Sequence, residues 1–120
     1  MTSLPLDGIR VVDFTQVMLG PCCTQMLADY GAEVIKVEKA KIGDLSRWSL
    51  GSDPDGLNNP VFSSLNRNKK SLALDLKQDE ARAAVRALID TADVVVNNFR
   101  PDVMERMGFG YEELKRTNPR

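Results

Sequence analysis

The chain of 120 residues contains no histidine and only two cysteines, Cys22 and Cys23, which are adjacent. Without histidine the chain cannot form a Ser-His or Cys-His nucleophile pair, and it lacks the commonest zinc ligand. Adjacent cysteines match neither a C-x-x-C motif nor the spacing of an ordinary disulfide. We therefore expect no metal site and predict that the cysteines are small packing residues in a reducing compartment, one of them buried in a helix.

The sequence also lacks a dominant charge and a long apolar run. Its 16 Lys and Arg nearly balance its 17 Asp and Glu, and the formal net charge of −1 provides no field that attracts nucleic acid or an anionic membrane. No stretch approaches the run of about 20 apolar residues that a membrane helix needs, and residues 1–6 do not resemble a signal peptide. We expect a cytoplasmic protein that binds neither nucleic acid nor membrane.

The order of the predicted elements is typical of an α/β fold. Short runs rich in β-branched residues predict strands at residues 9–14, 33–37, 71–75 and 93–97. Helices are predicted at residues 21–30, 79–92 and 111–116, with a further helix opening at Pro101, and Gly31 is placed as a left-handed cap. This alternation indicates a Rossmann-like parallel sheet with helices on both faces.

Two segments depart from this alternation. Residues 38–60 are rich in Gly, Pro, Asp and Asn, which predicts a long irregular loop that is functional or covered by a partner. After the last predicted helix a right-handed crossover would return another strand, but the sequence ends there. We therefore expect residues 1–120 to form a truncated part of a larger domain, with an incomplete sheet.

Ligands of open α/β sheets bind at the carboxyl ends of the strands, which points to the loops after residues 14, 37, 75 and 97. Lys77, Arg100 and Arg106 follow two of these strand ends, and residues 66–70 concentrate three more cations just before a strand. Converging cations suit a phosphorylated ligand, because they form charge-assisted hydrogen bonds with phosphate oxygens. A solvated charged turn is the better account of each cation taken alone, and their shared location at strand ends makes the two accounts equally good for the set.

Two acidic residues at strand ends have alternative interpretations. Glu38 stands where dinucleotide-binding folds have a ribose-binding carboxylate, but residues 15–20 contain no G-x-G-x-x-G motif. This argues against nicotinamide or flavin binding and leaves Glu38 equally well explained as a carboxylate that pairs with a helix or loop. For Asp13 we favour a structural role as a hydrogen-bond acceptor.

Motifs follow one another in order along nearly the whole chain, at residues 7–14, 20–21, 30–38, 43–44, 66–71, 74–77, 92–96, 98–101 and 108–120. In this order and spacing they resemble class III CoA-transferases, a family that includes formyl-CoA transferase, carnitine CoA-transferase and α-methylacyl-CoA racemase. The resemblance implies that residues 1–120 are the N-terminal part of a CoA-binding large domain. It further implies an interlocked homodimer for the full-length chain.

The resemblance also implies an enzyme that moves CoA from a thioester donor to a small carboxylic acid, with a formyl-CoA:oxalate-like reaction as the nearest expectation. CoA is then a substrate, and no resident cofactor is expected. The family nucleophile is an aspartate that lies beyond Arg120, so no catalytic residue is assigned here and residues 1–120 alone are expected to be inactive. The CoA-binding positions implied by the resemblance are Met18, Leu19, Lys39, Leu74, Asp75, Leu76, Lys77, Asn98, Phe99, Arg100 and Arg106.

This sequence departs from formyl-CoA transferases at positions 18, 19 and 39, where they commonly have Gln-Ala and Arg. Lys39 keeps the positive charge but loses the bidentate fork of a guanidinium. Two alternatives stay open. One is an α-methylacyl-CoA racemase of the same family, whose acid/base pair would also lie downstream. The other is a stand-alone nucleotide-binding or regulatory module.

Overall fold

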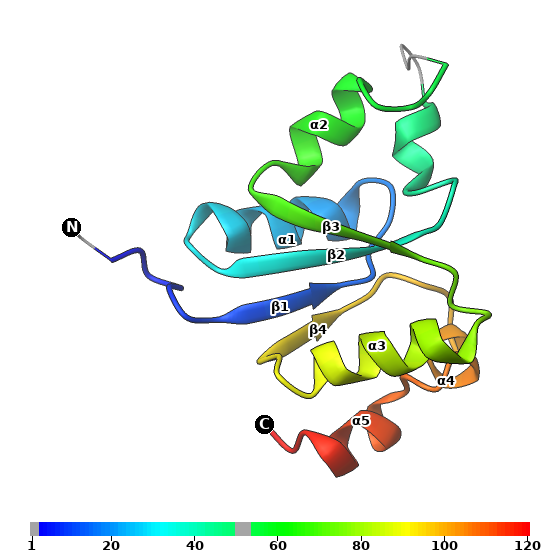
Figure 1. The fold of residues 1–120 in the computed structure, drawn as a ribbon. Helices are drawn as coiled ribbons and strands as arrows, with labels where there is room; N and C mark the ends of the chain where they lie inside the picture. The colour runs from blue at the N-terminus through cyan, green and yellow to red at the C-terminus, as the bar shows by residue number, and fades with distance from the viewer. Residues whose placement is uncertain (1–2, 50–53) are drawn as a thin grey trace.

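The structure, a computed structural model, describes residues 3–49 and 54–120 and contains a four-stranded sheet in the order β3-β2-β1-β4. The strands are β1 (Arg10–Asp13), β2 (Glu33–Lys39), β3 (Lys69–Leu74) and β4 (Val94–Val96). Each neighbouring pair is parallel. The predicted Rossmann-like α/β sheet is therefore confirmed, together with the positions of its strands (Figure 1).

Helices connect the strands on both faces of the sheet. They are α1 (Leu19–Asp29), α2 (Pro60–Asn66), α3 (Asp79–Ile89), α4 (Val103–Arg106), α5 (Tyr111–Thr117) and the 3-10 helix η1 (Leu45–Trp48). The α1 helix lies behind the sheet in Figure 1 and α3 lies in front of it. Gly31, with φ of 104°, follows α1 as the predicted left-handed residue. None of the helices in the described ranges combines the length and the apolar character that a membrane crossing requires.

The expectation of a wholly irregular segment at residues 38–60 was wrong, because η1 and the start of α2 lie within it. Both helices have side-chain N-caps. Asp44 accepts a hydrogen bond from the Ser46 amide, and Asn59 accepts from the amides of Val61 and Phe62. Pro60, in the first turn of α2, needs no amide partner. Residues 50–53 of this segment lie outside the described residues.

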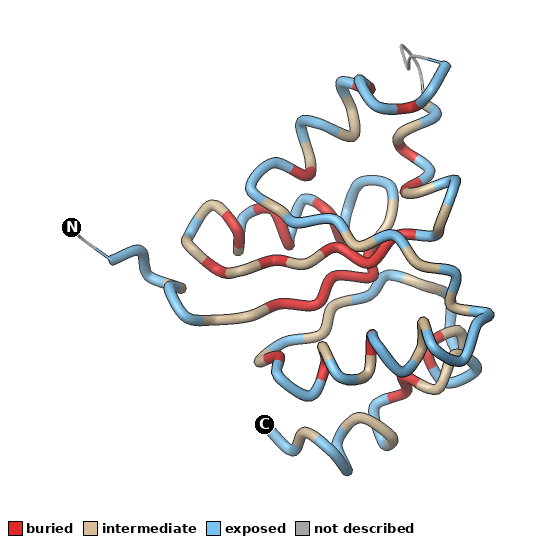
Figure 2. The backbone as a smooth tube through the Cα atoms, viewed as in Figure 1, coloured by how far each residue is buried: buried red, intermediate tan, exposed pale blue. Residues whose placement is uncertain are grey.

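The two faces of the sheet have separate cores. On the face covered by α3 and α4, the buried cluster comprises Val12, Phe14, Val37, Val85, Ile89, Ala92, Met104 and Phe109. On the α1 face a smaller apolar cluster comprises Val11, Ala28, Ala32 and Val34. Burial is concentrated along the central strands β1 and β2 (Figure 2). The alternation of side chains along each strand separates the two sets.

The predicted burial of one cysteine in a helix was wrong, because Cys22 and Cys23 are both exposed, free thiols on α1. The buried residues of this helix are Gly20, Pro21, Thr24, Gln25 and Ala28. They recur at intervals of three and four, which defines a single face toward the sheet. Residues 22 and 23 fall on the other face.

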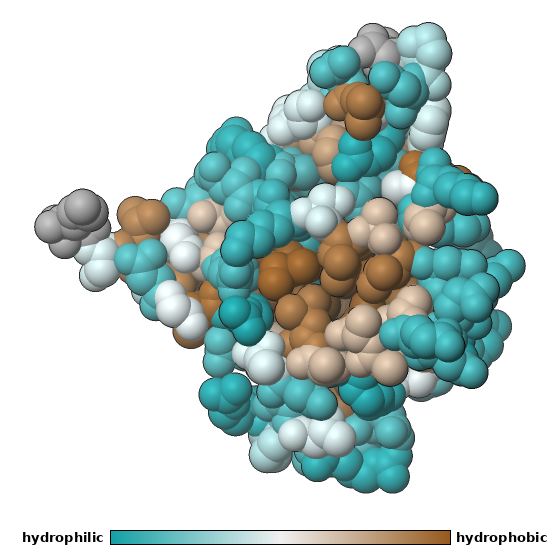
Figure 3. Space-filling view, viewed as in Figure 1, coloured by the Kyte–Doolittle hydropathy of each residue, from teal (hydrophilic) through white to brown (hydrophobic). Residues whose placement is uncertain are grey.

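Part of the sheet is uncovered. β4 pairs with β1, and no strand among the described residues pairs with its other side. A hollow of about 420 Å³ lies beside this edge, between β4 and α5. Apolar side chains also gather over the strands on the α3 side (Figure 3). Leu74 of β3 is only partly buried against the cluster on this side.

Candidate functional site at the carboxyl ends of the strands

The parallel strands all end at one edge of the sheet. The chain passes from β1 to β2 and on to β3 in one direction, and α3 then returns it to β4 on the other side of β1. The topological switch point is therefore between β1 and β4, where open α/β sheets bind their ligands. The loop after β1 and the loop after β4 border this point.

Every residue predicted to bind CoA lies at a strand end, on the loop that follows it or on the adjacent helix. After β1 these are Met18 and Leu19; at the ends of β2 and β3 they are Lys39 and Leu74, then Asp75, Leu76 and Lys77; after β4 they are Asn98, Phe99, Arg100 and, in α4, Arg106. Lys39 and Leu74 are register partners, which joins two of these groups directly. The topology brings the segments to one edge, while their binding of CoA stays a prediction.

Ion pairing separates the cations of this edge from most others. Within residues 3–49 and 54–120, the Lys and Arg side chains without an ion-pair partner are Lys39, Lys41, Lys77, Arg100, Arg106 and Lys115. All of them are exposed, and all except Lys115 lie at or after the carboxyl end of a strand. Exposed, unpaired cations at one edge favour a site for an anionic ligand.

The cations of residues 66–70 do not belong to this group. Arg67 pairs with Asp29, Lys70 pairs with Glu33, and Lys69 is buried against Asp13. β3 begins at Lys69, so this segment lies at the amino end of its strand. The prediction that these cations converge with those at the carboxyl ends was therefore wrong. Residues 66–70 lie at the amino end of β3, and the length of the strand separates them from the cations at the carboxyl ends.

Several predicted residues also have local structural roles. The Asp75 carboxylate accepts a hydrogen bond from the Lys77 amide at 3.1 Å, and the Leu76 carbonyl accepts from Arg82 at 2.8 Å. Phe99 is partly buried against the apolar core. Met18 and Leu19 are 59% and 84% exposed, and no side chain caps the first turn of α1. The apolar pair and the open helix start therefore lie free at the switch point.

Asp13, at the end of β1, is fully buried and confirmed as a structural acceptor. Its carboxylate accepts hydrogen bonds from the amide and hydroxyl of Thr15, at 2.8 and 2.5 Å, and from the Thr24 hydroxyl at 2.6 Å. The Lys69 ammonium lies 3.2 Å away. Burial lowers the pKa of Lys69, and the attraction of Asp13 opposes this effect. Asp13 thus joins β1 to α1 and is shielded from any ligand.

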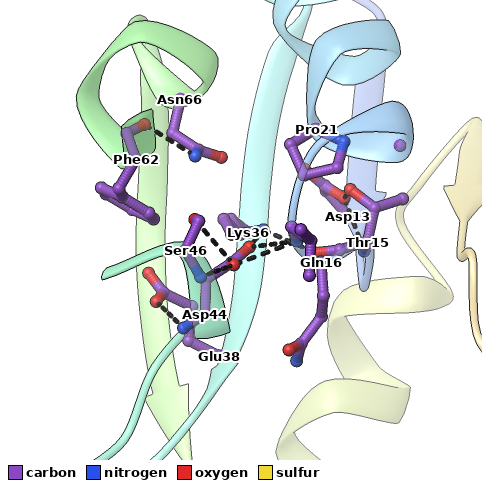
Figure 4. Close-up of polar contacts among 12 residues, drawn as sticks. Asp13, Thr15, Gln16, Pro21, Lys36, Glu38, Asp44, Ser46, Phe62 and Asn66 are labelled. Carbon is purple, nitrogen blue, oxygen red and sulfur yellow. Dashed lines mark hydrogen bonds and ion pairs between the residues drawn. The ribbon is translucent and has the colours of Figure 1, made fainter. Parts of the chain in front are cut away.

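A second buried network underlies the loop after β1 (Figure 4). Lys36 and Asp44 form an ion pair at 2.9 Å, with side chains 2% and 0% exposed. Burial tends to raise the pKa of Asp44, but hydrogen bonds from Lys36 and from the Ser46 amide outweigh it and hold that pKa below its usual value. Asp44 is therefore a charged residue inside the fold.

Glu38 is the loop-pairing carboxylate that one of the two interpretations proposed. It accepts two hydrogen bonds from Arg47, at 2.8 Å each, and others from the Ser71 hydroxyl and the Asp44 amide. Burial tends to raise the pKa of Glu38, while these donors outweigh that effect and lower it. Its oxygens are occupied by protein donors, which supports pairing with the loop over ribose binding.

Sequence reasoning did not assign Gln16 any role. The backbone amide of Gln16 donates to the Asn98 side-chain oxygen at 2.8 Å, and the backbone carbonyl of Gln16 accepts from the Asn98 side-chain nitrogen at 2.9 Å. This contact joins the loops after β1 and β4 across the switch point. Gly20 was named from the sequence only within the motif at residues 20–21, but a Cβ there would lie 2.4 Å from the Thr15 Cβ. Gly20 is therefore required for the close approach of α1 to the loop.

The chemistry available at this edge is anion binding. Lysine ammonium and arginine guanidinium groups bind phosphate oxygens, and exposed apolar side chains offer a surface for an uncharged part of the same ligand. In the described part of the chain, no three His, Cys, Asp or Glu side chains are placed to hold a metal ion.

Comparison with known sequences gives consistent matches. Residues 6–120 match the profile of CoA-transferase family III. Formyl-CoA:oxalate CoA-transferase of Rhodopseudomonas palustris (strain TIE-1) is 49% identical over 115 residues, which cover 96% of this chain and 27% of that protein. The protein of the same name from Escherichia coli O6:H1 is 46% identical over 118 residues, which cover 98% of this chain and 28% of that protein. This chain thus spans somewhat more than a quarter of these curated relatives.

Solved structures share the fold. A CAIB/BAIF family protein from Brucella suis has a TM-score of 0.87 at 39% identity, covering 98% of this chain and 32% of its own. The protein Rv3272 of Mycobacterium tuberculosis has a TM-score of 0.86 at 44% identity, covering 97% of this chain and 31% of its own. Because the family profile extends over residues 6–120 and the same fold recurs in these proteins, the chain belongs to CoA-transferase family III.

Proposed function

We propose that this chain is the CoA-binding part of an acyl-CoA transferase that moves CoA from a thioester donor to a small carboxylic acid. The family match and the transferase names of its relatives support this reaction class. CoA acts as a substrate, and the protein needs no resident cofactor. The named relatives favour the transferase over the racemase.

The observation that carries the proposal is the group of exposed, unpaired cations at the carboxyl ends of the strands. Lys39, Lys77, Arg100 and Arg106 come from three different strand ends, beside a switch point that suits a nucleotide. The phosphates of CoA would be held by these cations. Met18, Leu19 and Phe99 would contact the apolar parts of the ligand.

Arg106→Ala tests this site in the full-length protein. Removing a charge-assisted hydrogen bond worth about 1.5–3 kcal/mol should raise the CoA dissociation constant about 10- to 150-fold, measured by titration calorimetry. Turnover at saturating CoA should change less. An unchanged dissociation constant in a folded variant would remove Arg106 from the site.

A matched pair of lysines separates local binding from general charge. Lys77 and Lys115 are both exposed and without an ion pair among the described residues, but Lys77 follows β3 and Lys115 lies on α5. We expect Lys77→Ala to weaken CoA binding and Lys115→Ala to leave it unchanged. Equal effects of the two changes would indicate long-range attraction in place of a site.

For the substrates, we propose formyl-CoA as donor and oxalate as acceptor, on the basis of the names of the two relatives. A panel of CoA thioesters and carboxylates with the full-length enzyme, followed by chromatography of the CoA products, tests this choice. Exchange of deuterium at the α-carbon of a branched acyl-CoA without CoA transfer would support the racemase. We expect residues 1–120 alone to show no acyl exchange.

We also propose a homodimer for the full-length protein and a cytoplasmic location. Met26 on α1 and Tyr30 directly after the helix are both exposed, and this apolar surface fits contact with another chain segment or subunit. The exposed free thiols of Cys22 and Cys23 fit a reducing compartment. Light scattering of the purified protein tests the dimer, and cell fractionation tests the location.

A further inference from the structure

Val17 has an unusual backbone conformation in the loop after β1. Its φ is 70°, in the left-handed region, and its side chain is β-branched and 45% exposed. Left-handed conformations are strongly disfavoured for β-branched residues, so they persist only where surrounding contacts hold them. An exposed side chain supplies little packing, and the cause must therefore lie in the backbone contacts of the loop.

The buried pair Lys36 and Asp44 supplies those contacts. The Val17 amide donates to both oxygens of the Asp44 carboxylate, at 3.0 and 3.3 Å. Lys36 donates to the Thr15 carbonyl at 2.5 Å and pairs with the same carboxylate at 2.9 Å. One ion pair thus holds the loop on both sides of Gln16, while Asn98 binds the backbone of Gln16 itself.

The held loop leads directly into the proposed CoA site. Met18 follows Val17 and is the N-cap residue of α1, and Leu19 opens the helix. A change of φ at Val17 would swing both exposed side chains and the first amides of the helix away from the switch point. Lys36 and Asp44 can therefore determine where Met18, Leu19 and the start of α1 point, although neither charged side chain is exposed to a ligand.

We propose that Lys36 and Asp44 are positioning residues that hold Val17 in the left-handed conformation and thereby set Met18, Leu19 and the start of α1 for CoA. This role rests on the proposed function. The pair acts through the loop and does not itself touch CoA. Preorganisation of this kind increases affinity because the loop is already ordered before the ligand binds.

Asp44→Ala in the full-length protein provides the first test. Loss of the Val17 acceptor should raise the CoA dissociation constant about 10-fold or more. It should also speed amide hydrogen exchange in the peptide that contains residues 15–19. Asn59→Ala is the matched control: Asn59 is buried and caps α2, so its loss should lower the melting temperature without changing CoA affinity.

Asp44→Ala in the Val17→Gly background separates the positioning of Val17 from a general stabilisation of the fold. Glycine adopts a positive φ without steric cost, so Asp44→Ala should weaken CoA binding markedly less, by about 3-fold or less, in that background. If Asp44→Ala does not fold, Lys36→Met combined with Asp44→Leu removes both charges together and retains an apolar interior. This double variant should show the same loss of affinity.

Each outcome distinguishes the two proposals. Unchanged CoA affinity in Asp44→Ala or in the double variant, or an equal loss with Val17 and with glycine at position 17, would overturn the positioning role and leave the proposed function standing. Failure of the unaltered full-length protein to bind CoA in calorimetry would overturn the proposed function. In that case the proposed role of Lys36 and Asp44 in CoA binding is overturned as well, even if hydrogen exchange shows that Asp44 orders the loop.

Discussion

The side of the sheet covered by α3 and α4 buries a large apolar cluster, whereas the side covered by α1 and α2 buries charged side chains from the same strands beside a smaller apolar cluster. Val12 and Phe14 point to the first side, and Asp13 between them points to the second. In β2, Val37 alternates in the same way with Lys36 and Glu38. Because successive side chains of a strand point to opposite faces, an apolar core lies on one face of the sheet and a network of hydrogen bonds and ion pairs lies on the other.

The two faces contribute differently to this fold: one mainly stabilises it, and the other fixes the conformation of a loop. Apolar burial stabilises without fixing direction, while a buried carboxylate must satisfy particular donors at particular distances. The charged side includes the two networks that hold the loop after β1, around Asp13 and around Asp44. That loop is where the proposed site needs a defined backbone.

The largest expected effect is on the charged side. Asp13→Ala should lower the free energy of unfolding by about 3–5 kcal/mol, because Lys69 is left buried without its partner. Urea unfolding measures the change. The control is Asp29→Ala, which breaks the more exposed pair with Arg67 and should cost much less, because solvent screens that pair. Equal costs for the two variants would contradict the distinction between the two kinds of ion pair.

The apolar side should respond to lost volume. Ile89 is 1% exposed in the cluster with Phe14 and Phe109. Ile89→Ala should lower the free energy of unfolding by about 2–5 kcal/mol, and Ile89→Val by about 0.5–1.5 kcal/mol, because the cavity is smaller. Thermal unfolding followed by circular dichroism tests the order. A valine variant as unstable as the alanine variant would show that shape, and not volume, limits this core.

The smallest expected effect is a difference in pH dependence between the sides. The pKa of Glu38 is lower in the folded state, where hydrogen bonds from Arg47 and Ser71 outweigh its burial. In the window between the folded and unfolded pKa values, the unfolded state binds more protons. The contribution of Glu38 is therefore complete above the ordinary glutamate pKa of about 4.3 and is lost as the pH falls through the folded value.

Glu38→Gln should accordingly cost stability at pH 7 and progressively less below about pH 4, measured by urea unfolding across this range. Ile89→Ala serves as the comparison, since its cost comes from apolar volume and should not change with pH. A cost for Glu38→Gln that is constant with pH would show that the ionised carboxylate is not what the donors stabilise.

Local patterns in the sequence were enough to predict much of the fold. β-Branched runs predicted the four strands, and the apolar spacing and cap signals predicted α1, α3 and α5. The helix opening near Pro101 was also confirmed, as α4. α2 and η1 were missed, because Gly, Pro and Asn obscured short helices whose caps, Asn59 and Asp44, belong to the same polar stretch.

The sequence by itself determined the alternation of strands and helices and placed the proposed CoA residues at strand ends, because these follow from local periodicity and from motifs in order. Only the tertiary structure decided which cations stay free and which are paired. Lys69 and Lys77 look alike in the sequence, yet one is buried against Asp13 and the other is exposed after β3. The contact of Asp44 with Val17 spans 27 positions, and only packing around β2 brings the two together. Such pairings depend on distances between segments, which no local pattern encodes.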